Sequence, residues 1–222
     1  MLVSAHQPAY LPWLGYIEKI VKSDVFIYLD TVQFEKNSFT NRNKVKTANG
    51  EVMLTVPVKM KNHTSLIMSD MLINNNQDWQ KKHLATISQN YKKAPYYNEI
   101  MPLIEKFYTK KYEHLSDYCY DYLFVWLNRF DIKTPIVKSS TLDINSSKSD
   151  LVLDLCKSQN ADRYLSGALG KDYLDVDKFK KEGITVEFQN YQPKPYPQLW
   201  KGGFVPCLGI IDYAMNNKEL VL

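Results

Sequence analysis

The chain has few cysteines, and its three, Cys119, Cys156 and Cys207, stand alone in the sequence. No two of them form a CxxC pair and their number is odd, so we expect neither a disulfide framework nor a cysteine-built zinc site. The histidines show no HExxH spacing, which argues against a zinc protease. The sequence therefore predicts no metal site.

Long apolar runs are also absent. No segment approaches the roughly 20 apolar residues that a membrane-spanning helix needs. The first residues contain neither a basic region nor a long apolar core of the kind that a secretory signal has. We therefore expect a protein that stays in the cytoplasm and has no membrane partner.

Charge of one sign is not in large excess, because the net charge is only +4. The lysine pairs alternate with acidic residues or tyrosine, as on solvated helix faces, and form no stripe that would follow a nucleic-acid backbone. A mildly basic balance still favours an anionic substrate such as a nucleotide. The 16 tyrosines suit a cleft for a polar, partly apolar ligand, although an ordinary core or surface position is the favoured interpretation of any single tyrosine.

The opening of the chain reads strand, turn, helix, strand within about 30 residues, which is typical of a parallel βαβ unit. Pro8 ends the first strand, and Pro12 precedes a helix over 13–21. Strands alternating with helices predict an α/β fold, with a mostly parallel sheet and a Rossmann-like opening βαβ unit. The expected strands are residues 1–5, 24–30, 52–58, 67–73, 134–138, 162–166 and 184–189.

The middle of the chain is predicted to be helical. Trp79, His83, Ile87 and Tyr91 lie four apart on one face of a helix over 77–91, and a long helical stretch over 99–129 is broken near 109–111. Further helices are expected up to Ser158 and at 208–216. With 222 residues and no clear linker, we predict one domain over 1–222 with a helical subregion at about 77–130.

The first candidate site follows the opening strand. His6 and Gln7 would lie at its carboxyl end, which is where open parallel sheets bind ligands. Pro8 and Pro12 hold the connection to the helix rigid. His6 is a candidate general base, or a candidate hydrogen-bond donor to a phosphate. The alternative is a strand-end histidine that hydrogen-bonds to backbone.

The second candidate follows the strand over 24–30. Asp30 ends this strand beside His6, and a polar connection over 33–49 follows it. In that connection, Lys36 and Arg42 are suited to hold phosphates or carboxylates. The alternative is a solvated loop with surface charge.

The third candidate is the turn after the strand over 162–166. Gly167 and Gly170, three residues apart, allow a ligand to approach the backbone closely, and amides at such a turn bind anions. The segment lacks the GxxxxGK[ST] pattern of a P-loop. A plain turn is the alternative. His83 is predicted to pack or cap more than to catalyse, and Ser166 lacks the GxSxG context of a nucleophile.

At these residues the chain resembles the WbqC-like family, over nearly its whole length. Gly209 is a departure, because a serine is expected before the Ile-Ile-Asp segment. The resemblance implies a bacterial protein of O-antigen or related surface-polysaccharide biosynthesis. The residues that carry the resemblance are His6-Gln7-Pro8, residues 11–16, Asp30, Gln33, Arg42, residues 55–58, Trp79, His83, Tyr91, Ala94-Pro95, residues 165–167, residues 173–175 and Ile211-Asp212.

A weaker likeness is to pantothenate synthetase, an enzyme of the nucleotidyltransferase-type α/β fold. Residues 13–16 stand where that enzyme has its HxGH motif, and neither histidine is kept. Residues 166–174 loosely resemble its later serine-rich nucleotide loop. The likeness implies activation of a carboxylate by ATP followed by amide formation, and the missing histidines count against adenylation.

Our first functional hypothesis is transfer of an acyl or aminoacyl group to the amino group of a nucleotide-linked amino sugar. The donor would be an ATP-activated acid, an acyl thioester or an aminoacyl-tRNA. The alternatives are a glycosyltransferase or other sugar-nucleotide enzyme, although no DxD motif appears, and a non-catalytic binding module. The candidate catalytic residues are His6, Gln7 and Asp30, and the candidate substrate-binding residues are Tyr10, Trp13, Tyr16, Gln33, Lys36, Arg42, His83, Ser166, Gly167, Gly170 and Tyr173.

Overall fold

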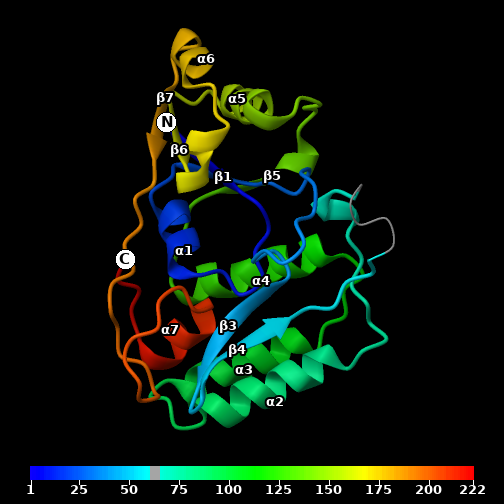
Figure 1. Ribbon diagram of the computed structural model, residues 1–222, viewed down its shortest axis with the longest axis vertical. Coiled ribbons are helices and arrows are strands. Elements are labelled where there is room, and N and C mark those ends of the chain that lie inside the picture. The colour runs from blue at the N-terminus through cyan, green and yellow to red at the C-terminus, as the bar shows by residue number, and fades with distance from the viewer. Residues whose placement is uncertain (61–65) are drawn as a thin grey trace.

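The main sheet has five parallel strands in the order β5-β2-β1-β6-β7 and lies in the upper part of the view in Figure 1. The structure is a computed structural model that describes residues 1–60 and 66–222. The α/β class and the parallel opening unit are confirmed. The strands are β1 (Leu2–His6), β2 (Val25–Tyr28), β5 (Ile136–Lys138), β6 (Arg163–Ser166) and β7 (Thr185–Phe188).

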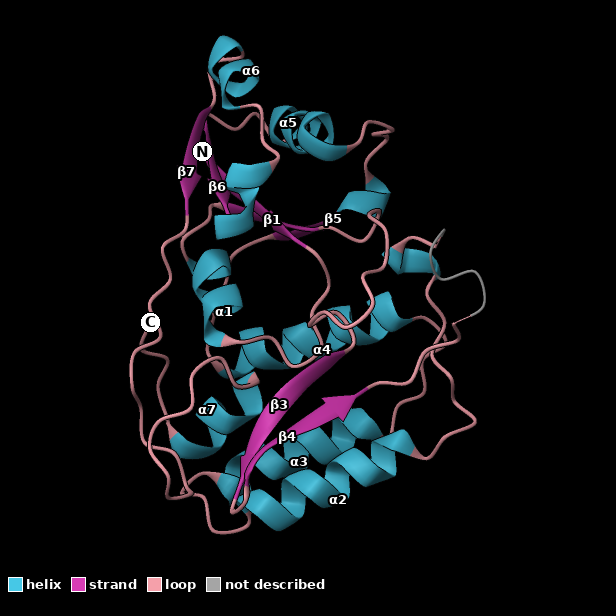
Figure 2. Ribbon diagram, in the orientation of Figure 1, coloured by secondary structure: helices cyan, strands magenta, loops and turns pink. Residues whose placement is uncertain are grey.

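Helices cover both faces of this sheet (Figure 2). α1 (Leu14–Val21) and α4 (Leu115–Arg129) lie on one face, and α5 (Lys148–Ser158) and α6 (Val176–Lys181) lie on the other. Right-handed crossovers require this division, because the chain first adds strands on one side of β1 and later on the other. Alternate strand residues therefore enter different cores: Val3 and Ala5 pack toward α5, whereas Phe26 packs toward α1.

The direction of strand addition reverses between β1 and β6. These strands pair from Leu2 with Arg163 to Ser4 with Leu165, while β1 also pairs with β2 from Val3 with Val25 to His6 with Tyr28. In open α/β sheets, ligands bind beyond the carboxyl ends of the strands, next to such a reversal. The end of β1 is therefore the natural place to look for a site.

The connection between β2 and β5 holds an antiparallel hairpin, β3 (Arg42–Thr47) with β4 (Gly50–Thr55), and then α2 (Trp79–Tyr91) and α3 (Tyr97–Tyr108) before α4. The prediction of a polar loop over 33–49 was wrong for its second half, which forms β3. Val45 is the one apolar residue of this strand, so the sequence shows no alternation of apolar and polar residues there. The strand expected over 67–73 contains a short 3-10 turn, η1 (Met68–Asp70). The predicted break near 109–111 is confirmed, since α3 ends at Tyr108.

The last part of the chain crosses from the sheet to the hairpin. After β7, residues 189–209 run past α1 to α7 (Ile210–Asn216), which packs beside β3 and α3 (Figure 1). Gln189 Nε2 donates to the Gly15 carbonyl at 2.9 Å, and a Cβ at Gly15 would lie only 2.7 Å from the Tyr191 ring. The short helix α6 was not predicted. Within the described ranges, no helix has both the length and the apolar character to cross a bilayer.

Candidate functional site at the carboxyl edge of the sheet

A pocket of about 810 Å³ lies at the carboxyl edge of the sheet, beyond the ends of β1 and β2. It is bounded by the loop after β2 and by the first turn of α5. Three predicted site residues, Gln7, Gln33 and Lys36, line it. The full lining is Gln7, Thr31, Val32, Gln33, Phe34, Glu35, Lys36, Ser146, Ser147, Lys148 and Leu151.

The pocket has a basic rim. Lys36 and Lys148 are both exposed and come from the two elements that bound the pocket, with Glu35 as an acidic neighbour. Ser147 is the residue before the first turn of α5, so the positive end of that helix also faces this space. The side chains present hydroxyl, amide and ammonium groups, which are suited to a polar ligand that carries negative charge.

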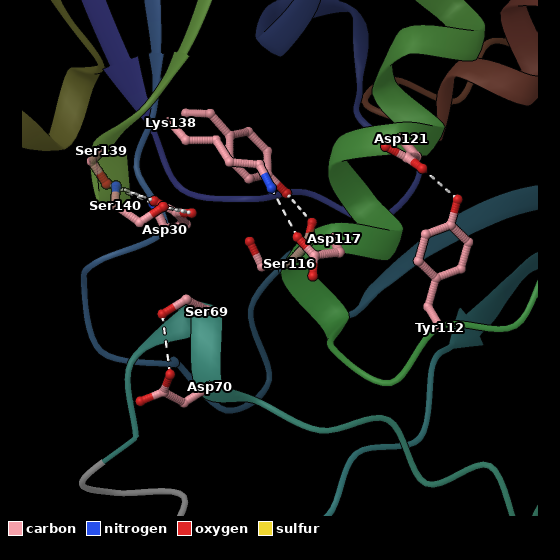
Figure 3. A network of polar contacts seen from close by, with 11 residues as sticks. Asp30, Ser69, Asp70, Tyr112, Ser116, Asp117, Asp121, Lys138, Ser139 and Ser140 are labelled. Atoms are coloured by element: carbon pink, nitrogen blue, oxygen red, sulfur yellow. Dashed lines mark hydrogen bonds and ion pairs between the residues drawn. The ribbon is translucent and has the colours of Figure 1, made fainter. Parts of the chain in front are cut away.

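Asp30 lies at the end of β2 in a network of polar contacts (Figure 3). Its buried carboxylate accepts hydrogen bonds from Ser139 Oγ at 2.9 Å, from the Ser140 amide at 2.8 Å and from Ser140 Oγ at 2.7 Å. These bonds hold the 3-10 turn η2 (Ser139–Thr141) that follows β5. Asp30 thus fixes the backbone on one side of the pocket, where Thr31 lines it.

Lys138, the last residue of β5, belongs to the same network. Its Nζ atom lies 2.8 Å from Asp117 Oδ1 and 4.4 Å from the centre of the Tyr120 ring. Figure 3 shows this pair beside the Asp30 cluster, with Ser116 below it on the first turn of α4. Both charges of this pair are matched within the chain, and neither residue lines the pocket.

His6 lies on the other side of β1 from the pocket lining. Its half-buried ring packs edge-on against Trp13, at 5.4 Å between ring centres, and against Tyr16, at 4.8 Å. Nδ1 donates to the Gln7 carbonyl at 3.0 Å, because a carbonyl oxygen can only accept. This fixes the tautomer and leaves Nε2 as a hydrogen-bond acceptor.

Burial lowers the pKa of His6 to about 3; the Lys19 ammonium adds to this effect, and the Gln7 carbonyl opposes it. The imidazole is therefore neutral at pH 7 and a weaker base than an ordinary histidine. Such a ring is better suited to accept a hydrogen bond than to store a proton.

Lys19 is a residue that the sequence reasoning missed. It is only 2% exposed, and its Nζ atom donates to the Ala5 carbonyl at 2.7 Å. Burial lowers the pKa of this ammonium from 10.5 to about 7. The helix period could have indicated this burial. Lys19 lies three residues after Tyr16 and four before Ser23, on the side of α1 where both of those residues are buried.

The two glycines after β6 have different roles. A Cβ at Gly170 would lie 1.9 Å from Ser166 Oγ, so Gly170 is required for packing. A Cβ at Gly167 would lie 3.8 Å from Lys19 Nζ, with no other described heavy atom outside its chain neighbours within 4 Å. Ser166 is buried, and its hydroxyl donates to the Gly167 carbonyl at 3.1 Å. Only Gly167 opens toward the end of β1.

Tyr10 and His83 lie inside the core between the hairpin and the helices and do not line the pocket. The Tyr10 hydroxyl bonds to His83 Nδ1 at 2.7 Å and to the Tyr108 hydroxyl. Burial lowers the pKa of His83 to about 4. His83 therefore makes packing contacts inside the core, as predicted from the sequence.

The remaining predicted residues are placed apart from one another. Trp13 and Tyr16 surround His6, as described above. Arg42 donates to Asn37 Oδ1 at 3.2 Å and to the Asn37 carbonyl, and so braces its own loop. Tyr173 is exposed beside the 3-10 turn η3 (Ala168–Asp172). The structure therefore brings Gln7, Gln33 and Lys36 together in the pocket and groups His6 with Gly167 at the strand reversal.

The comparisons with known proteins agree with the resemblance seen in the sequence. The family model of the WbqC-like protein family matches residues 7–220. An uncharacterized protein of Mycobacterium tuberculosis, Rv1507c, is 31% identical over 216 residues, which cover 96% of this chain and 93% of that protein. No solved structure matches the chain.

Proposed function

The chain belongs to the WbqC-like protein family, and we propose that it is a transferase of bacterial surface-polysaccharide biosynthesis. Its reaction is the transfer of an acyl or aminoacyl group to the amino group of a nucleotide-linked amino sugar. The amide bond forms as the bond from the acyl carbon to the donor's leaving group, a phosphate or nucleotide, a thiol or a tRNA, breaks, and the amine releases a proton. The nucleoside diphosphate part of this substrate binds in the pocket at the carboxyl edge of the sheet.

The position and lining of this pocket carry the proposal. Its volume of about 810 Å³ falls within the range of about 300–1,000 Å³ that is common for small-molecule sites. Lys36 and Lys148 provide two positive charges from opposite elements, which suits a diphosphate between them. Gln7 and the Ser147 hydroxyl are available for the hydroxyl groups of ribose and sugar, whereas the Ser146 hydroxyl already donates to Asp154 at 2.6 Å.

Gln7 links the pocket to His6. Its side chain lines the pocket, and its carbonyl fixes the His6 ring, so His6 Nε2 is held as a neutral acceptor at the end of β1. In amide formation, such an acceptor orients the N–H bonds of the attacking amine. An activated donor, whether an ATP-activated acid, an acyl thioester or an aminoacyl-tRNA, already contains the energy of the reaction. The main contribution of the protein is then to position the two substrates.

The first test is ligand binding, measured by thermal shift with a panel of nucleotides and nucleotide-linked sugars. A ligand at a hundred times its dissociation constant adds about 2.7 kcal/mol of stability, which is readily measured. We expect the amino-sugar nucleotides to give the largest shift. Lys36→Met and Lys148→Met reduce the shift, whereas Lys180→Met, which removes an exposed lysine of α6, leaves it unchanged.

The second test is product formation, followed by intact mass with an amino-sugar nucleotide and each class of activated donor. The expected product gains the mass of one acyl group on the sugar amine. Tight nucleotide-sugar binding with no acyl product from any donor would contradict the transfer reaction. Release of the free sugar in the presence of Mg²⁺ or Mn²⁺ would point to the glycosyltransferase alternative.

A further inference from the structure

We propose that the space beside Gly167, at the ends of β1 and β6, is a second ligand subsite, in which Lys19 binds an anionic oxygen group, a phosphate or a carboxylate. The inference rests on the proposed use of this edge for substrate binding. It concerns a different location from the pocket, because neither Lys19 nor Gly167 lines that pocket.

Lys19 is a buried cation without an acidic partner. None of the described carboxylates lies within ion-pair distance of its Nζ atom, and its hydrogen-bond acceptor is the Ala5 carbonyl at 2.7 Å. An ammonium has three N–H donors, so two remain available. Burying a charge without an opposite charge is costly, and lysine is almost never this buried unless it is paired. A partner from outside the chain would remove this penalty.

The ammonium lies where the sheet opens. β1 and β6 stop pairing after Ser4 and Leu165, and the next outward carbonyl, that of Ala5, accepts from Lys19. The side chain thus reaches from α1 to the point at which the two strands part. This is the position at which doubly wound sheets bind their ligands.

Gly167 provides space next to the ammonium. Outside its own chain neighbours, the described atom that a Cβ at this position would approach within 4 Å is Lys19 Nζ, at 3.8 Å. Gly167 has φ −67° and ψ 165°, an extended conformation that any residue adopts. The backbone therefore does not require glycine here. The missing side chain leaves room for a ligand atom against the ammonium.

The electrostatics make binding dependent on pH. Burial lowers the pKa of Lys19 to about 7, so the side chain is only partly charged in neutral solution. A bound anion favours the charged form and raises this pKa. Binding therefore takes up a proton near and above pH 7, and it weakens as the pH rises.

The test is isothermal titration of the full chain with sulfate, whose charge does not change between pH 6.5 and 8.5. We expect binding about tenfold weaker at pH 8.5 than at pH 6.5, and proton uptake that appears as a difference between buffers of unlike ionisation enthalpy. Parallel titrations with phosphate and with acetate distinguish the two sources of the anionic group. Preference for phosphate and sulfate assigns the subsite to a phosphate, and preference for acetate assigns it to a carboxylate.

Two variants locate the binding. Lys19→Met removes the charge and Gly167→Ala fills the space, and each is expected to weaken sulfate binding at pH 6.5 by at least about tenfold, the equivalent of losing one charge-assisted contact. Lys22→Met is the matched control, because Lys22 is exposed near the end of α1 and pairs with Glu18. Circular dichroism confirms that each variant is folded.

The outcomes separate this inference from the proposed function. Sulfate binding by Lys19→Met equal to that of the wild type, or unchanged by Gly167→Ala, overturns the inference. Loss of nucleotide binding in Lys36→Met, with pH-dependent sulfate binding retained, supports two separate subsites. If no nucleotide sugar binds while sulfate still depends on Lys19, the proposed function fails and the inference stands.

Discussion

Two buried lysines show how the sheet edge differs from the region of the hairpin and helices. Lys46 of β3 and Lys19 of α1 are each 2% exposed. Lys46 Nζ donates to Gln198 Oε1 at 3.1 Å and to the Gly203 carbonyl at 2.6 Å. The buried Asp212 carboxylate nearby adds an opposite charge. Lys19 has one backbone carbonyl and no described carboxylate partner.

The buried network around Lys46 is internally complete. The Asp212 carboxylate accepts from Tyr91 at 2.7 Å and from Tyr196 at 2.9 Å. Burial raises the pKa of Asp212, while the two tyrosine hydroxyls and Lys46 oppose that rise. Here the chain neutralises its own buried charge, and the hydrogen bonds of this network connect β3, α7 and the segment 189–209. At the sheet edge the chain supplies no opposite charge for Lys19, and a binding site for an anion requires such an unmatched positive charge.

The largest expected effect comes from breaking the complete network. Asp212→Ala leaves Lys46 without its nearby charge and two tyrosine hydroxyls without their acceptor, and we expect a loss of about 3–5 kcal/mol in the free energy of unfolding. Urea denaturation followed by circular dichroism measures this loss. A loss below about 1 kcal/mol would show that the network contributes little and would remove the contrast with Lys19.

The next effect is on the pH dependence of stability. Lys19 has a folded pKa of about 7 and an unfolded pKa of 10.5. Between these values the unfolded chain holds more protons, so the stability of the wild type rises with pH, by at most about 1.4 kcal/mol per pH unit. Lys19→Met removes this contribution and is more stable than the wild type at pH 7. Parallel stability curves for the two proteins from pH 7 to 10 would disprove the lowered pKa.

A smaller effect separates the two glycines after β6. Gly170→Ala places a methyl group 1.9 Å from Ser166 Oγ, and we expect a loss of about 1–3 kcal/mol from overpacking. Gly167→Ala is expected to change stability by less than about 0.5 kcal/mol. Melting temperatures of both variants test this difference. Equal losses would mean that the space beside Lys19 is already filled.

The smallest effect is on the titration of His6. Lys19→Met removes the positive charge that helps to lower the pKa of His6, while the larger effect of burial remains, so we expect this pKa to rise. His83 lies elsewhere in the core, and its pKa stays at about 4 in both proteins. Imidazole NMR signals across pH 2.5 to 7 measure both groups. An unchanged His6 would place the ammonium too far away to act on it.

The sequence predicted those parts of the fold whose pattern is local. The apolar run over 24–30 contains β2 and the alternation over 184–189 contains β7, and most residues of these two strands are buried or half-buried. β3 escaped prediction because a hairpin strand with lysines at 44 and 46 looks like a solvated loop until its neighbours are known. α6 was missed because a helix of two turns has too little periodicity to detect.

Prediction of the candidate site was limited by the same cause. The end of β1 was recognisable, since Pro8 and the strand before it mark it in the sequence. The separation of Tyr10 and His83 from the pocket depends on how the hairpin packs on α2 and α4, which no local pattern encodes. Lys148 was missed because a surface lysine gives no local signal of a site. Lys19 was missed because a buried lysine looks like a surface one unless the helix period is applied to it.

The crossing segment 189–209 has a consequence for how the chain folds during synthesis. The Gly209 amide donates to the Lys44 carbonyl at 2.9 Å, Ile210 donates to the Pro12 carbonyl at 2.8 Å, and Tyr96 donates to that of Met215 at 3.0 Å. These contacts join residues far apart along the chain, so the loop between them must close late. During synthesis, β1 and the hairpin would lack their contacts with α7 until residue 215 leaves the ribosomal exit tunnel. In that interval we expect the emerging chain to depend most on chaperones.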